Sequence, residues 1–268
     1  MTETATLGID LASQPKLTAL CRIDWRPGRR GYAYCPALDQ SDEDMLALMG
    51  RDDVTKVGID APFGWPAAFI EGLVDYRRAG LWPDAPGEDA GQREMQLRAT
   101  DRFVHEKTKI HPLSVSTDKI AFTAMRCARL LAAYHSVSAE QLDRSGQGRL
   151  IEVYPAAALL QWDLSPAHDP QDPGSYKGSS PDAVGRRHRL VEAVRSQVED
   201  WLELPEKTVV VCRDSDHCLD SLLCALIARA AELGQVEPIP VDDVRARDEG
   251  WIALPRREPL SRLGQRFP

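Results

Sequence analysis

Two aspartates lie at the ends of apolar segments of this sequence. The end of a buried strand is a place where a site can open. Asp10 closes the apolar run at 5–11, and Asp60 closes a second run at 54–60. Strands of this composition are typical of sheets covered on both faces, whose carboxyl ends carry the binding crevices. A buried carboxylate there needs a partner, because an isolated buried charge is costly. The alternative is a turn in which the aspartate caps the next segment, and Ala61-Pro62 makes that alternative less suitable for Asp60.

A third aspartate, Asp220, lies on or beside the apolar stripe of a helix predicted from Ser215 to 233. The stripe has helical spacing and consists of Leu219, Leu222, Leu223, Leu226, Ile227 and Ala230. Because Asp220 is past the first turn, N-capping does not explain it. Asp216 lies one turn earlier on the same face, and two ionised aspartates there would repel unless a cation joined them. Asp216 and its neighbour Asp214 can also be first-turn anions or caps.

Carboxylates on separate elements, without histidine or cysteine among them, favour hard divalent cations. The sequence therefore predicts a site for Mg²⁺ or Mn²⁺. Such ions activate water and stabilise a leaving oxygen at phosphorus, and paired ions lie ~3.5–4 Å apart. Glu152 is a further acidic candidate, inside a strand predicted at 150–154, unless it is a solvated position on a half-exposed strand.

Composition limits the class of protein. The 268 residues contain 33 Lys and Arg against 41 Asp and Glu, a net charge of −8, which excludes a basic coat for nucleic acid. Local basic segments at 26–30, 186–189 and 256–266 leave room for a basic track that contacts a nucleic acid or nucleotide. No apolar run approaches the ~20 residues that span a bilayer, and the N-terminus lacks a signal-peptide pattern. We expect no membrane partner, a cytoplasmic location and six reduced cysteines; the oligomeric state stays open.

The elements that position the acids follow from periodicity and turn signals. Strands are predicted at 5–11, 17–24, 31–35, 54–60, 150–154 and, as a buried run VVVC, 209–212. Helices are predicted after an N-cap at Ser41 and before Gly50, near 67–78, and at 92–107, 118–134, 182–203 and 215–233, with loops over 61–92 and 163–181. This order indicates an α/β protein with a mixed sheet and helices on both faces.

Seven short motifs run along nearly the whole chain: GIDLA at 8–12, GIDAPFG at 58–64, RATDR at 98–102, EVYPAA at 152–157, YKGS at 176–179, DHCLDSLLCALIA at 216–228 and EGWIALP at 249–255. In this order they resemble the family catalogued as domain of unknown function 429, described as predicted nucleases of ribonuclease-H-like fold. The late-helix motif also looks like that of Holliday-junction resolvases, in which an aspartate near the helix start binds metal.

The resemblance implies a fold and a set of site residues. The fold would be one ribonuclease-H-like domain over 1–268, with a five-stranded mixed sheet, an insertion at about 65–148 after the fourth strand and a C-terminal tail from about 235. The metal-binding and catalytic acids would be Asp10, Asp60 and Asp220, with Asp216 or Glu152 as a fourth. Basic and cofactor-contacting positions would be Lys177, Arg187 and the pair Arg98–Asp101. The alternatives are a solvated loop cation for Lys177 and a surface i, i+3 ion pair for Arg98 and Asp101.

Three functions are consistent with these residues. The first is a metal-dependent nuclease or phosphodiesterase, in which Lys177 or Arg187 offsets charge on the phosphate. The second is a nucleotide-binding phosphotransferase of the actin-like group, although the turn LASQPKLT at 11–18 lacks the glycine that a close phosphate approach requires. The third is a non-catalytic scaffold, whose partner surface would use aromatic residues near a Pro-rich loop, namely Phe63, Trp65, Phe69 and Trp82; the same residues could form a satellite core.

Overall fold

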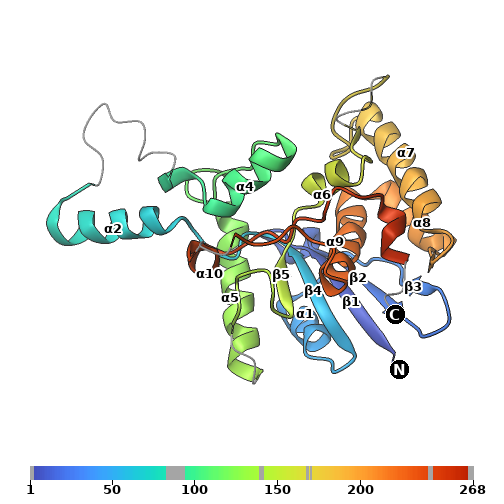
Figure 1. The fold of residues 1–268 in the computed structure, drawn as a ribbon, viewed down its shortest axis with the longest axis horizontal. Coiled ribbons are helices and arrows are strands. Elements are labelled where there is room, and N and C mark those ends of the chain that lie inside the picture. Colours follow the sequence, from blue (N-terminus) through green and yellow to red (C-terminus); the bar gives the residue numbers. More distant parts are fainter. Residues whose placement is uncertain are drawn as a thin grey trace.

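A computed structural model describes residues 3–82, 94–138, 142–166, 169, 171–240 and 244–264. Parts of the loops expected over 61–92 and 163–181, the start of the helix expected over 92–107, and parts of the C-terminal tail lie outside these residues. Figure 1 shows a central sheet with helices packed around it and with α2 extending away from it.

The centre of the molecule is a mixed sheet, and within the described residues it has six strands. Their order across the sheet is β5-β4-β1-β2-β3-β6. The strands are β1 (Thr4–Asp10), β2 (Ala19–Trp25), β3 (Gly31–Ala33), β4 (Val54–Asp60), β5 (Leu150–Glu152) and β6 (Leu202–Glu203). The first three form an antiparallel meander, β4 adds in parallel beside β1, and β5 adds in parallel beside β4. The α/β class and the mixed sheet are confirmed, whereas the expected count of five strands is corrected to six.

The sixth strand is not the one predicted at 209–212. Those residues belong to α8 (Glu206–Asp214), which Pro205 precedes at the N-cap position. Thr208, Val209 and Cys212 are buried at helical spacing, while Val210 is exposed. A short apolar run does not by itself distinguish a strand from a buried helix segment. The edge strand β6 instead pairs in parallel with β3, through Gly31 and Leu202.

Most of the predicted helices are present, with shifted ends. Ser41 caps α1 (Asp42–Met49) by accepting a hydrogen bond from the Asp44 amide at 3.1 Å, and Gly50 follows the helix as predicted. The predicted helices near 67–78, at 118–134, 182–203 and 215–233 are α2 (Ala67–Ala79), α5 (Ala121–Val137), α7 (Pro181–Val198) and α9 (Asp216–Glu232).

Two predicted boundaries are corrected. α4 (Ala99–Thr108) begins at Ala99 because the Asp101 carboxylate accepts the Arg98 amide proton, which makes Arg98 the N-cap. Pro155 does not only end a strand: it opens α6 (Pro155–Gln161), since proline fits the first turn of a helix. Further short elements among the described residues include α10 (Arg245–Glu249) and the 3-10 helices η1 (Pro15–Leu17) and η3 (Leu260–Gly264).

Helices cover both faces of the sheet, and each face has its own apolar core. One core joins β2 to α7, α8 and α9 and contains Leu190, Val209 and Leu223; the other joins β1 and β4 to α1 and α5 and contains Met45 and Leu130 (Figure 1). The backbone of α9 lies almost against the strands, because a Cβ at Gly8 would stand 2.0 Å from the Ser221 carbonyl oxygen and one at Gly58 would stand 2.6 Å from that of Cys224. Glycines on two neighbouring strands therefore let α9 reach the middle of the sheet.

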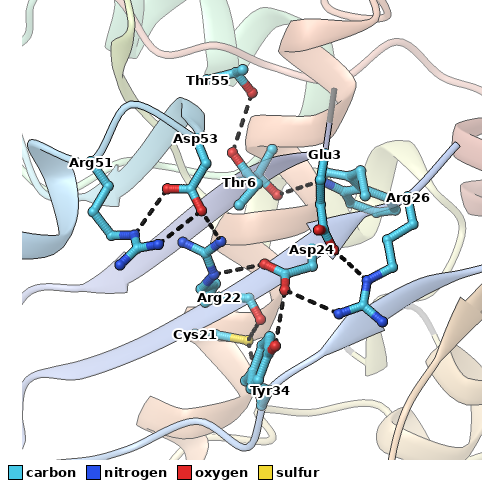
Figure 2. A network of polar contacts seen from close by, with 12 residues as sticks. Glu3, Thr6, Cys21, Arg22, Asp24, Arg26, Tyr34, Arg51, Asp53 and Thr55 are labelled. Atoms are coloured by element: carbon cyan, nitrogen blue, oxygen red, sulfur yellow. Dashed lines mark hydrogen bonds and ion pairs between the residues drawn. The ribbon is translucent and has the colours of Figure 1, made fainter. Parts of the chain in front are cut away.

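A polar network ties β2, β3 and the start of β4 together at the end of the sheet away from Asp10 (Figure 2). Arg22 donates to Asp24 at 2.7 Å and to Asp53 at 2.6 Å, and the Tyr34 hydroxyl donates to Asp24 at 2.9 Å. Arg51 adds two further hydrogen bonds to Asp53. The network therefore links β2 to the residue that follows β3 and to the residues that precede β4.

All six cysteines are unpaired; five are buried and Cys35 is half-buried, as predicted for reduced core residues. Among the described helices, none has the length and apolarity that a membrane crossing requires. The cytoplasmic location stays a prediction.

Candidate metal centre

The parallel pairing of β1 with β4 brings the two strand-ending acids together. Asp10 and Asp60 are direct register partners. Asp220 enters from the second turn of α9, on the part of the helix that packs on Gly8 and Gly58. One oxygen from each of the three carboxylates lies within 4.8 Å of the others. Three acids that are distant in the sequence thus share one small volume.

The environment of these acids disfavours the presence of several negative charges. Asp10 and Asp220 are buried and Asp60 is half-buried. Burial raises the pKa of Asp10, and the nearby Asp220 charge raises it further, against a hydrogen bond from His217. Burial also raises the pKa of Asp60 well above its usual range; Lys177 opposes this, while Asp10 and Asp220 add to it. A cation placed among the three carboxylates would relieve this repulsion.

Lys177 lies against the acids and is not a freely solvated loop cation. Its Nζ is 2.6 Å from Oδ2 of Asp220, and the Tyr176 hydroxyl donates to Oδ1 of the same carboxylate at 2.6 Å. Burial alone would lower the pKa of Lys177, but Asp220, Tyr176 and Asp60 outweigh it and raise the pKa well above its ordinary value. Both oxygens of the buried Asp220 are therefore partnered by the YKGS motif.

Arg187 and Asp216 hold that motif in place. Arg187 is buried, and its guanidinium donates to the carbonyl oxygens of Tyr176, Gly178 and Arg213 at 2.8–3.0 Å. Asp216 accepts the Gly178 amide proton at 2.8 Å. Gly178 has a φ of +97°, which favours glycine at this turn. Asp216 is outside the group of three close acids, and Arg187 directs its donors at backbone carbonyls.

Behind Asp60 lies a buried ion network. Arg98 donates to Glu152 at 2.7 and 2.8 Å and to Asp101 at 2.9 Å, and all three side chains are at most 3% exposed. The Phe63 amide donates to Glu152 at 2.9 Å, while Glu249 accepts the amide protons at the start of α2 and α4. Burial raises the pKa of Glu152, against the attraction of Arg98. The alternatives of a surface ion pair and a solvated strand position are wrong, because these groups lie in the interior.

Sequence reasoning missed two groups at the site. Nδ1 of His217 is 2.6 Å from Oδ2 of Asp10, and this hydrogen bond raises the pKa of His217. Its position three residues before Asp220 on one helix was a signal, because residues i and i+3 share a face. Tyr154 lines the same cavity, and burial together with Asp60 raises its pKa to about 12. Tyr154 follows Glu152 by two residues, which is the strand alternation that places side chains on one face.

Several arginines of the basic segments that were proposed as a track form ion pairs with acidic residues. Arg186 and Arg189 both pair with Asp172, and Arg26 pairs with Glu3. In the third segment, Arg257 and Arg262 also pair with acids, at 3.6 and 3.9 Å. These ion pairs reduce the positive charge that the segments offer to a phosphate chain.

The aromatic residues near the Pro-rich loop do not form one surface. Phe63 is 2% exposed and belongs to the core that includes α1 and α5, whereas Trp82 is 46% exposed and meets Tyr76 edge-on. This arrangement gives no specific support to the scaffold hypothesis. The turn after β1 contains η1 and no glycine, so it does not favour the phosphotransferase either.

A cavity of about 680 Å³ opens over the acids. Asp10, Asp60 and Lys177 line it, and the connection between α4 and α5 contributes another part of the lining, including Ile110 and Leu113. Arg98, Asp101 and Glu152 also reach its surface, although their polar atoms are engaged with one another. Asp10 and Asp60 are thus accessible from a space that a ligand can enter.

Comparison with known proteins gives one family. A family model described as "Protein of unknown function (DUF429)" matches residues 8–245, which covers all three acids, Lys177 and His217. The comparisons with curated proteins and with solved structures found no match.

Proposed function

We propose that this chain, which belongs to the DUF429 family as its motifs indicated, is a divalent-metal-dependent phosphodiester hydrolase of the nuclease class. The observation that carries the proposal is the group of Asp10, Asp60 and Asp220, whose oxygens lie within 4.8 Å of one another, with Asp10 and Asp60 lining a cavity. The pKa values of Asp10 and Asp60 are raised, and acids with perturbed pKa values in a cleft are typical of functional sites.

The donor set fits a hard cation. All three groups are carboxylates, which suits Mg²⁺ or Mn²⁺ and does not suit a thiolate-seeking or imidazole-seeking metal. Asp10, Asp60 and Asp220 would hold the ion. When bound, it would supply Lewis acidity, which lowers the pKa of water and stabilises charge on a phosphoryl oxygen. Asp216 accepts a hydrogen bond from the Gly178 amide. It would therefore influence the metal ligand Asp220 only through the YKGS loop.

The protein's own side chains supply the remaining roles in this proposal. In the net reaction, a water oxygen bonds to phosphorus, the ester P–O bond breaks, and one water proton ends on the leaving oxygen. Lys177 is placed to neutralise a phosphoryl oxygen, because its side chain lines the cavity. His217 is placed to hold a proton beside Asp10. Glu152, predicted as a catalytic acid, instead holds the Phe63 amide and positions the chain after Asp60.

The proposal includes the ribonuclease-H-like fold of a single domain over 1–268. Its support is the antiparallel meander of β1, β2 and β3 followed by parallel β4 and β5 on the other side of β1. The helices α2, α4 and α5 all fall between β4 and β5, within the insertion proposed at about 65–148. The tail from about 235 returns to the sheet at its edge strand β5, since Ala253 donates to the Glu152 carbonyl at 2.8 Å.

A metal titration tests the proposal. Mn²⁺ and Mg²⁺ binding is measured by calorimetry on the wild type, on an Asp10→Asn, Asp220→Asn double variant and on an Asp182→Asn control, whose carboxylate is exposed in the first turn of α7. We expect binding in the wild type and control, its loss in the double variant, and metal-dependent cleavage of phosphodiesters that follows the same order. If no binding occurs, even with a nucleic acid present to complete the site, the proposal is overturned.

A further inference from the structure

The cavity above the acids has the size of a small-molecule site. Its volume is about 680 Å³, and pockets for ligands of this kind span roughly 300–1,000 Å³. Its lining combines charged and polar side chains, among them Asp10, Asp60, Lys177 and Tyr154, with the aliphatic side chains of Ile110, Leu113 and Ile120. This combination suits a ligand with one charged group and one less polar group.

One wall of the cavity, formed by residues between 108 and 123, is mainly apolar. Ile110, Pro112, Leu113 and Ile120 line it, beside the polar Thr108, Lys109 and Thr123. Leu113 is 44% exposed although it is a large aliphatic side chain. An exposed apolar residue on a cavity wall is informative, because a ligand that covered it would remove apolar surface from water.

Hydrogen bonds within the chain build this wall without a ligand. The Ser114 hydroxyl donates to the Gln96 carbonyl at 2.7 Å and accepts the Thr117 amide proton at 3.1 Å. The Asp118 carboxylate accepts the Ser114 amide proton at 2.8 Å. Because these hydrogen bonds hold the backbone that follows Leu113, binding costs little ordering of this part of the wall.

The charges around the cavity match one phosphate better than a chain of phosphates. Among the described residues that line it, the Lys and Arg side chains are Arg98, Lys109 and Lys177. Arg98 is held by Asp101 and Glu152. Two cations remain in the lining, whereas a bound nucleic acid strand draws its affinity from many Lys and Arg contacts.

We propose that this cavity binds a small phosphodiester of nucleotide size, with its phosphate at Lys177 and the acids and its organic group against Ile110, Leu113 and Ile120. The inference rests on the proposed function and narrows its substrate class from nucleic acid strands to small diesters. Tyr154 is placed to stack with an aromatic substituent, because its ring lies in the same cavity. Hydrolysis would release a phosphomonoester and an alcohol, with water as the only co-reactant.

Two matched substitutions test the wall. Leu113→Glu places a negative charge on the cavity wall, and Phe122→Glu places the same charge on α5 at a residue that is 72% exposed and does not line the cavity. Both positions are exposed, so neither substitution removes core packing. The probes are bis(p-nitrophenyl) phosphate, 3′,5′-cyclic AMP, and single-stranded and duplex oligonucleotides, each assayed with Mn²⁺.

We expect at least one small diester to be hydrolysed with a kcat/KM about tenfold or more above that of any oligonucleotide. Leu113→Glu should lower that value about tenfold, mainly through KM, while Phe122→Glu leaves it unchanged. Oligonucleotides cleaved as well as the small diesters, or equal effects of the two variants, would overturn the inference and leave the hydrolase proposal standing.

If no probe is hydrolysed, the hydrolase proposal fails, and calorimetric binding of the two small diesters decides the inference separately. Binding to the wild type that is about tenfold weaker in Leu113→Glu and unchanged in Phe122→Glu supports the cavity as their site. Absence of binding, or loss in both variants, overturns it.

Discussion

Replacing Lys177 by methionine tests what compensates the negative charge of the three acids when they hold no metal. The ammonium lies 2.6 Å from Asp220, which is 2% exposed, while the lysine side chain itself is 45% exposed. A divalent ion bound by Asp220 has to compete with this ammonium for the carboxylate. Methionine keeps most of the side-chain length and removes the charge, so the competition disappears.

The size of the effect follows from this geometry. A hydrogen bond to a charged group contributes roughly 1.5–3 kcal/mol, and the exposure of the lysine places the pair at the lower end, because water screens it. About 1.5 kcal/mol corresponds to roughly a tenfold change in an equilibrium constant. We therefore expect Lys177→Met to bind Mn²⁺ about tenfold more tightly than the wild type.

The same change should destabilise the metal-free protein. Asp220 stays buried and keeps only the Tyr176 hydroxyl as a partner, so about 1–2 kcal/mol of the free energy of unfolding is lost. For a chain of this size that lowers Tm by about 2–6 °C. Saturating Mn²⁺ should restore Tm, because a ligand that binds the folded state stabilises it.

The assay is calorimetry with Mn²⁺, combined with thermal unfolding followed by circular dichroism in a chelator and in saturating Mn²⁺. Lys109→Met is the control, because Lys109 lines the same cavity but its Nζ donates to the Glu106 carbonyl at 3.0 Å and not to an acid. The reasoning is refuted if Lys177→Met binds Mn²⁺ with the same or lower affinity than the wild type while it remains folded, or if Lys109→Met gives the same gain.

Two further predictions concern the fold that carries the site. Gly8→Ala should lower the free energy of unfolding by about 3 kcal/mol or more, since its Cβ would stand 2.0 Å from the backbone of α9. Gly185→Ala in α7, whose Cβ would have its nearest contact at 3.8 Å, should raise the free energy of unfolding by up to about 1 kcal/mol. Urea unfolding of both variants checks this prediction, and an equal loss of stability in both would contradict it. Hydrogen bonds from Arg51 and Arg22 hold the pKa of Asp53 below its usual 3.8 (Figure 2), so its contribution is present above that pH and is lost as pH falls towards the lower folded-state pKa. Asp53→Asn should therefore cost about 1 kcal/mol at pH 7 and almost nothing at about pH 2, as measured by urea unfolding; a cost that does not change with pH would contradict the assignment.

Local sequence signals predicted the elements with strong, redundant patterns. The apolar runs that end in Asp10 and Asp60 became β1 and β4, and the cap and stop signals at Ser41 and Gly50 bound α1 as expected. The strand predicted at 209–212 was wrong because four residues are too few to show a period. The helix there is recognisable only from the side chains that the core buries.

Arg98 illustrates a different kind of failure. An i, i+3 pair with Asp101 looks like an ordinary surface ion pair, and nothing in the local sequence indicates that both residues are buried with Glu152, which is 54 residues from Arg98 along the chain. Burial of a charged group depends on which distant partner neutralises it, and periodicity contains no information about that partner.

The sequence by itself determined which chemistry was available: acids at the ends of apolar strands and within an apolar helix, without a cluster of soft ligands beside them. Tertiary structure alone decided which acids meet. Parallel pairing set Asp10 beside Asp60, and the close approach of α9 to Gly8 and Gly58 added Asp220. Asp216, one turn earlier, is turned to the backbone of the YKGS loop instead. Which of the two acids on α9 joins the site depends on the position of the helix over the sheet, to within a few ångströms. Only packing sets that position.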